Sequence, residues 1–290
     1  MLVALCAALW RFWIVRGHLT EGRAWLERAL EDQREPDAVL AEALFGACAL
    51  NAAAGAFERA RRYGADRLAV VRKLGDAEGT ASALRSLANV NVHLGELEAA
   101  GQLYEEAAAH ARAAGALPAL AAHMNNLGYL KLVARDPEAA VAPCTEAAAL
   151  FRDLGRPADA AGATLNVATA QLGLGNLDEA ASAIDSALEP YVALEYDEGI
   201  SYCLDAAAAL ALAWGTKGEA AVLAAAAAAV RAANGVTPEP VEQRLHEETV
   251  AALADAMSEP VGLSDAVAVA RAVLERGRRS LSARGPLSQP

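Results

Sequence analysis

The chain has 290 residues, of which 55% are hydrophobic and only 5% aromatic, and its formal net charge is −12. An acidic chain repels the phosphate backbone, so direct nucleic-acid binding is not expected. The four cysteines lie far apart and form no C-x-x-C pair, which excludes a zinc site of the usual spacing and predicts buried structural thiols. They are Cys6, Cys48, Cys144 and Cys203.

Residues 1–34 are predicted to form an irregular helix pair rich in aromatic side chains. Trp10, Phe12, Trp13 and Trp25 gather here in a chain otherwise poor in aromatics. We expect them to cap the first regular helix pair; the alternative is a docking surface for another domain. The apolar start lacks a basic n-region and carries Arg11 inside the run, so no signal peptide is expected and the chain is predicted to be cytoplasmic.

Residues 35–235 form five units with a period of 40 residues. Alanine recurs at Ala60, Ala100, Ala140, Ala180 and Ala220. A second series runs in phase, at Gly55, Gly95, Arg135, Gly175 and Gly215. A third marks the end of each unit, at Gly75, Gly115, Gly155, Glu195 and Gly235. Self-similarity at a fixed period in this range is the signature of a stacked-repeat solenoid.

Each unit has the pattern of two helices joined by a tight turn. In residues 81–120, apolar and small residues at positions 84, 87, 88 and 91 form one helical stripe. Gly95 interrupts it, and positions 97, 100, 104 and 107 form a second stripe. A small residue before each turn marks where the two helices touch, at Cys48, Ala88, Gly128, Ala168 and Ala208. Neither stripe is buried within one pair, so neighbouring pairs must stack and the fold is predicted to be all-α.

This pattern resembles the tetratricopeptide repeat (TPR). Leu84, Leu87, Ala88 and Asn91 match the leading motif of that family, and Ala100, Tyr104 and Ala107 match the later A-x-x-x-F-x-x-A segment. The resemblance implies a right-handed superhelical solenoid of antiparallel helix pairs. The period of 40 exceeds the family's usual 34, so each helix is expected to be longer, and glycine replaces the usual terminal proline.

Both ends resemble the TPR region of bacterial STAND-type regulators of the AfsR/SARP and LuxR-like groups. The segment GHLTEGRAWLERAL, residues 17–30, resembles the junction where their repeats begin. Residues 236–276 are predicted to be capping helices, one over 242–257 and one over 264–276, with a break at Glu259 and Pro260. Residues 277–290 are predicted to be a disordered tail. The resemblance implies a sensor and interaction arm.

The sequence contains no phosphate-loop motif and no basic helix-turn-helix segment; Gly215 to Gly218 belong to the fifth turn. If the chain comes from a STAND regulator, only the sensor arm is present, as a fragment, a separately encoded piece or a decayed gene. The alternative is a free-standing TPR adaptor that binds a peptide or protein and is unrelated to transcription.

Catalytic, metal and cofactor sites are not expected. The segment from His246 to Val250 starts like a zinc-protease motif, but Val250 stands where a second histidine is required. No serine or cysteine has a nucleophile's local pattern. A catalytic protein with an unrecognised site is the remaining alternative. The stretch 219–233 is too short and too rich in alanine to span a bilayer, so no membrane partner is expected, and the oligomeric state stays open.

The TPR resemblance places the first helix of each unit along the concave groove and implies a set of partner-binding positions. They are Arg85, Asn89, His93, Asn125, Asn126, Tyr129, Asn166, Thr169, Tyr202 and Asp205. Arg85, Asn89 and Asn126 match part of the set by which some TPRs hold a peptide carboxylate, but Gly162 and Asn166 leave that clamp incomplete. Asparagine amides pair well with a peptide backbone. The alternative is a groove whose polar residues merely face water.

Overall fold

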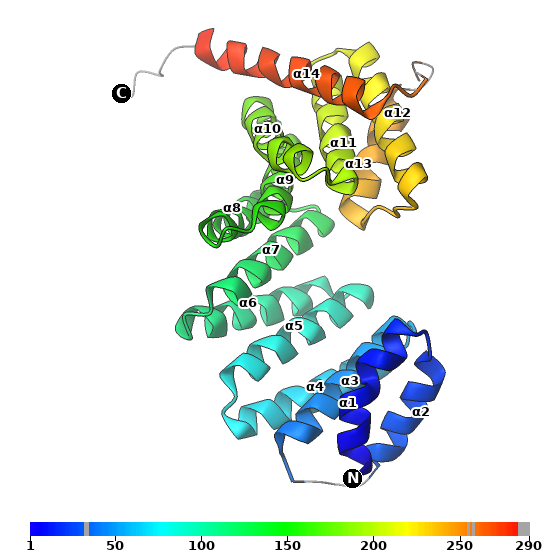
Figure 1. The fold of residues 1–290 in the computed structure, drawn as a ribbon. Coiled ribbons are helices and arrows are strands. Elements are labelled where there is room, and N and C mark those ends of the chain that lie inside the picture. Colours follow the sequence, from blue (N-terminus) through cyan, green and yellow to red (C-terminus); the bar gives the residue numbers. More distant parts are fainter. Residues whose placement is uncertain (32–34, 254–255, 257–258, 284–290) are drawn as a thin grey trace. The chain divides into compact units, whose positions relative to one another are not determined.

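The computed structural model of the protein describes residues 1–31, 35–253, 256 and 259–283, and only the backbone of 277–283. Over the described residues the chain forms fourteen α-helices and no strands. The chain divides into two compact units, residues 1–130 (unit 1) and 131–290 (unit 2), and each is described by itself (Figure 1). The all-α prediction is confirmed.

Unit 1 consists of three helix pairs and most of a seventh helix. Its helices are α1 (Leu2–Val15), α2 (Leu19–Ala29), α3 (Ala38–Ala53), α4 (Phe57–Leu74), α5 (Ala77–His93), α6 (Leu97–Ala113) and α7 (Leu117–Val133), whose last three residues belong to unit 2. Each helix packs on the next: α3 on α4, α4 on α5, and α5 on α6. This is the arrangement that one apolar stripe per helix requires.

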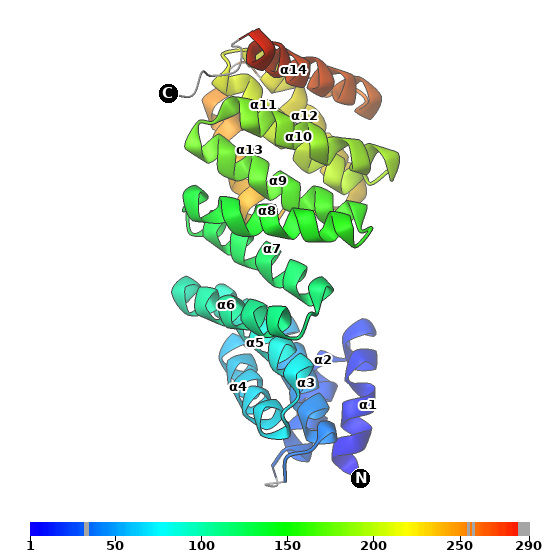
Figure 2. The ribbon, with the colours of Figure 1, turned by 90° about the vertical axis from the view of Figure 1, so that its left-hand side faces the viewer.

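Unit 2 continues the pairs and ends in two further helices. Its helices are α8 (Pro137–Asp153), α9 (Pro157–Leu174), α10 (Leu177–Ala193), α11 (Asp197–Ala213), α12 (Lys217–Asn234), α13 (Pro240–Leu253) and α14 (Leu263–Ala283). Figure 2 shows α8, α9 and α10 stacked one above another, as the packing of α8 on α9 and of α9 on α10 requires.

The helices keep the period of the sequence. The first helices of successive pairs begin at residues 77, 117, 157 and 197. All five alanines of the series from Ala60 to Ala220 are 0% exposed. Alanine combines the best helix propensity with the smallest side chain after glycine, so it lets helix axes approach closely at these points.

The turns between helices adopt a left-handed backbone wherever the repeat demands it. Gly95 has φ +78° and Gly175 has φ +75°, values that cost glycine little. Arg135 has φ +59° at the point equivalent to Gly95, and Glu195 has φ +51° at the end of its unit, where the unit before it has Gly155 with φ +68°. The backbone therefore follows the repeat even without glycine, at a cost of about 1 kcal/mol for each of these residues.

The aromatic residues of the first helix pair divide into two groups. Trp10 and Trp13 are buried, and each lies against a helical glycine. A Cβ at Gly46 would lie 2.6 Å from Trp10, and one at Gly22 would lie 2.8 Å from Trp13. Phe12 is 50% exposed. The tryptophans in α1 therefore join α1 to α2 and α3, whereas Phe12 faces outward.

The last two helices lie against different neighbours. Helix α14 packs on α10, α11 and α12, and α13 packs on α11 and α12 (Figure 1). Helix α13 spans 240–253, whereas the predicted helix was 242–257. Met257, the predicted last residue, lies outside the described residues. Helix α14 runs past the predicted end at Arg276 and through Gly277, because adding a residue to an existing helix is far easier than starting one. The rest of the predicted tail, 284–290, lies outside the described residues.

Candidate functional site

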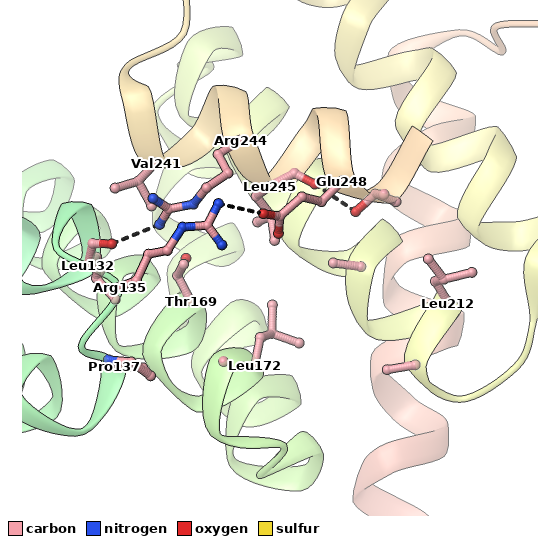
Figure 3. Close-up of a pocket in the computed structure, with 14 residues that line it drawn as sticks. Leu132, Arg135, Pro137, Thr169, Leu172, Leu212, Val241, Arg244, Leu245 and Glu248 are labelled. Atoms are coloured by element: carbon pink, nitrogen blue, oxygen red, sulfur yellow. Dashed lines mark hydrogen bonds and ion pairs between the residues drawn. The ribbon is translucent and has the colours of Figure 1, made fainter. Parts of the chain in front are cut away.

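A cavity of ≈460 Å³ lies in unit 2 between α13 and the first helices of the repeats. We call the wall opposite α13 the α13 groove and define it by Leu132, Arg135, Thr169, Leu172, Ala209 and Leu212. Helix α13 forms the other wall, with Val241, Leu245 and Glu248 among its lining residues (Figure 3). The cavity therefore has an apolar floor from α9 and α11 and polar groups along its rim.

Two polar contacts join α13 to the end of α7. The Arg244 Nη2 donates to the carbonyl oxygen of Leu132 at 2.7 Å, and the Arg135 guanidinium lies 3.1 Å from the Glu248 carboxylate (Figure 3). The last carbonyls of a helix have no partner within the helix and carry a partial negative charge. The Leu132 carbonyl already accepts from the Arg135 backbone N–H at 3.1 Å, and the Arg244 guanidinium is its second donor.

A third contact anchors α13 in the core of unit 2. The Asp205 side chain on α11 is 2% exposed and its two oxygens have different partners. Its Oδ1 lies 2.6 Å from Nδ1 of His246 on α13, and its Oδ2 accepts a hydrogen bond from Arg231 on α12. A buried carboxylate is stable only when it is paired in this way. The fragment that resembled a broken zinc motif thus supplies a structural contact through His246.

The four predicted groove residues of unit 2 lie on α9 and α11. Thr169 lines the cavity and its hydroxyl donates to the Leu165 carbonyl at 3.1 Å. Asp205 contacts α13 as described, and Asn166 is buried. The Tyr202 hydroxyl donates to Glu198 at 3.0 Å, and burial raises the pKa of Tyr202 above its usual range. The structure therefore places Thr169 and Asp205 beside α13.

The six predicted residues of unit 1 lie on α5 and α7. The Asn89 side-chain oxygen accepts a hydrogen bond from the Tyr104 hydroxyl. The His93 ring stacks on Phe57, with 4.6 Å between centroids and 9° between planes. The remaining residues of this set, Arg85, Asn125, Asn126 and Tyr129, are all partly exposed.

Sequence reasoning missed His123 of α7. This side chain is buried, and neither ring nitrogen has a hydrogen-bond partner among the described groups. Burial first, and the positive charge of Arg85 second, lower the pKa of His123 to about 4. The same Arg85 charge acts on Tyr104, whose pKa burial raises to about 12. A lone histidine in a helical stripe gives no sequence signal for such a cluster.

The reactive side chains are held in unreactive states. Burial raises the pKa of Cys48 to about 11 and that of Cys144 to about 12, and it raises those of Cys6 and Cys203 as well. Thiols with such values stay protonated at neutral pH and are poor nucleophiles. Among the described residues no group of three or more His, Cys, Asp or Glu could hold a metal, and no helix is both long and apolar enough to cross a membrane.

No protein-family model matches the chain, and no curated protein matches it. Solved structures do resemble it. BtubC (BKLC) from P. vanneervenii aligns with TM-score 0.63 and 20% identity, over 80% of this chain and 94% of that one. A STAND protein with a tetratricopeptide repeat sensor from Pyrococcus horikoshii aligns with TM-score 0.59 and 17% identity, over 88% of this chain but 36% of that one.

A Rap protein complexed with competence and sporulation factor aligns with TM-score 0.53 and 16% identity, over 92% of this chain and 74% of that one. At these identities the comparisons show the fold, which is that of TPR-like helical repeat proteins. The predicted resemblance to TPR proteins, including a STAND protein with a TPR sensor, is confirmed.

Proposed function

We propose that the chain is a non-catalytic interaction module whose α13 groove binds a peptide or protein segment. The cavity beside α13 carries this proposal. Its ≈460 Å³ falls within the size range of ligand sites, about 300–1,000 Å³. Its floor is apolar, and Arg135 and Thr169 of the α13 groove are polar groups that can orient a bound chain.

The comparisons support a sensing role. The Pyrococcus STAND structure carries repeats described as a sensor, and the Rap structure holds competence and sporulation factor. We propose that this chain is likewise the sensor arm of a cytoplasmic STAND or LuxR-like regulator. The alternative is a free-standing adaptor that binds a peptide or protein and is unrelated to transcription.

Filling the cavity tests the binding proposal. Peptides are selected from a random library on the full chain, and their affinities are then measured for Ala209→Trp, which places an indole in the floor of the cavity. We expect affinity to fall at least about tenfold, which corresponds to about 1.4 kcal/mol. Ala228→Trp, at an exposed position of α12, is the matched control. If both variants bind as the natural chain does, the α13 groove is not the binding site.

The predicted residues of unit 1 are tested with the same peptides. Arg85→Glu combined with Asn126→Ala changes the face of α5 and α7 without touching unit 2. Loss of binding in this variant alone would move the site to unit 1. The regulator type is tested by the DNA upstream of Met1: an in-frame phosphate-loop ATPase favours the STAND proposal over the adaptor, and its absence with a stop codon nearby removes the idea that the chain is a fragment.

A further inference from the structure

The α13 groove already holds a helix of the same chain. Val241, Leu245 and Thr249 lie at positions i, i+4 and i+8 of α13, and all three line the cavity. Figure 3 shows Val241 and Leu245 there. Residues at this spacing share one face of a helix. Helix α13 thus lies in the groove as an amphipathic helix lies in the groove of a binding partner.

The polar contacts of α13 add a charge pattern to this apolar face. Arg244, at i+3, bonds the Leu132 carbonyl at the end of α7. His246, at i+5, bonds the buried carboxylate of Asp205. Glu248, at i+7, pairs with Arg135 across the rim. Along α13, the groove therefore presents first the Leu132 carbonyl and the Asp205 carboxylate, and then the positive Arg135 guanidinium.

Fewer side chains are buried from α13 than from α14, although His246 of α13 also contacts the buried Asp205 carboxylate. Of the α13 side chains, Val241, Thr249 and Leu253 are buried, and the cavity remains beside them. Within 263–276 of α14, where side chains are described, five are buried, namely Ala266, Val267, Ala270, Val273 and Leu274. The rim pair contributes at most about 1 kcal/mol, because Arg135 and Glu248 are 69% and 57% exposed. A helix with so few buried side chains can detach from the α13 groove while α14 remains packed.

We propose that α13 is a built-in substitute for a partner helix. The partner is an amphipathic α-helix with apolar residues at i, i+4 and i+8, a basic residue at i+3 and an acidic residue at i+7, and it displaces α13 when it binds. This inference rests on the proposed function of the α13 groove and names the class of ligand. A tethered segment competes at an effective concentration of the order of 1 mM, so α13 also sets the threshold for binding.

The test uses a fluorescent synthetic peptide of residues 239–253 and the full chain. In the natural chain α13 competes with the peptide. Leu245→Glu in the chain places a charge in the apolar cavity, which weakens α13 and leaves the α13 groove unchanged. We expect the peptide to bind Leu245→Glu at least tenfold more tightly than the natural chain. Adding Ala209→Trp to that variant should abolish binding, and a peptide with Leu245→Glu should not bind either chain.

A second variant, at an exposed position, tests the inference even if Leu245→Glu does not fold. Glu248→Arg faces Arg135 with a like charge at an exposed position, and Arg135→Glu in the same chain restores an opposite pair. Amide hydrogen exchange of residues 241–253 should quicken up to about fivefold in Glu248→Arg and return in the double variant. Exchange of residues 266–274 should not change. Equal exchange of both segments in every variant would overturn the inference that α13 detaches separately.

Failure of this inference differs from failure of the proposed function. If library peptides bind the natural chain and are lost in Ala209→Trp, but the 239–253 peptide neither binds Leu245→Glu nor displaces them, the groove binds ligands and α13 is no substitute for one. If no peptide responds to Ala209→Trp, the proposed function fails first. If the 239–253 peptide displaces the library peptides, both hold.

Discussion

Among the described residues, the buried side-chain atoms that lack a hydrogen-bond partner all lie in unit 1, although Asn51 and Thr80 of that unit are bonded. In unit 2, Asp205 lies between Arg231 and His246, and the Thr249 hydroxyl donates to the Leu245 carbonyl at 2.8 Å. In unit 1, the Arg67 Nε, the Asn91 Oδ1 and both ring nitrogens of His123 have no partner among the described groups. In unit 2 the terminal helix α13 therefore supplies, through His246, a hydrogen-bond partner for the buried Asp205 of a repeat.

The largest effect is expected from breaking the buried pair of unit 2. Asp205→Ala leaves the Arg231 guanidinium buried, with its carboxylate partner removed. We expect the free energy of unfolding to fall by about 3–5 kcal/mol, measured by urea denaturation of the full chain. Combining it with Arg231→Met removes the stranded charge and should recover much of the loss. If Asp205→Ala alone were as stable as the natural chain, the buried polar groups of unit 2 would not depend on their partners.

His123 gives unit 1 a distinct pH dependence. Its pKa is lowered from 6.5 to about 4, so as the pH falls below 6.5 the unfolded chain binds a proton that the folded chain does not. The stability contribution is therefore complete above pH 6.5 and is lost as the pH falls to 4. The difference between these two pKa values corresponds to about 3 kcal/mol.

Urea denaturation of the natural chain and of His123→Leu, at pH 7 and pH 4.5, measures this effect. The carboxylates titrate alike in both chains, so the difference between the two chains isolates His123. The variant should lose less stability than the natural chain on acidification. Identical losses would show that His123 is accessible to protons in the folded state.

A matched pair of arginine variants should give effects of opposite sign. Arg67 of unit 1 contacts the Ser82 hydroxyl at 3.3 Å and lies 4.3 Å above the Phe45 ring, and its Nε is unsatisfied. Arg67→Met removes that donor and keeps a side chain against the ring, so we expect a gain of about 1 kcal/mol in unfolding free energy. Arg231→Met strands Asp205 and should cause a loss. Losses in both variants would show that Arg67 is stabilised where it lies.

Much of the fold was predictable because the repeat constrains it locally. The positions that alanine holds every 40 residues are the points where helices touch, and they are fully buried. The turns were predictable at their glycines and even at Arg135 and Glu195, since the period placed them in phase. The end of α14 was not, because one glycine at position 277 does not stop an established helix.

The candidate site was predictable only in part. The period places Thr169 and Asp205 on first helices, and the structure brings both beside α13. That α13 lies there was not predicted. Its bond from Arg244 reaches a backbone carbonyl 112 residues away, and a carbonyl has no sequence signature. His246 and Asp205 are 41 residues apart, and only tertiary packing brings them together.

The four buried cysteines have a practical consequence. Cys6 and Cys48 lie in unit 1, and Cys144 and Cys203 lie in unit 2. A thiol reagent modifies such a side chain only when the surrounding helices open, so the rate of modification reports local unfolding. Variants that keep one cysteine at a time would report the opening of each unit separately. The chain thus carries, without any added label, two reporters of motion in each half.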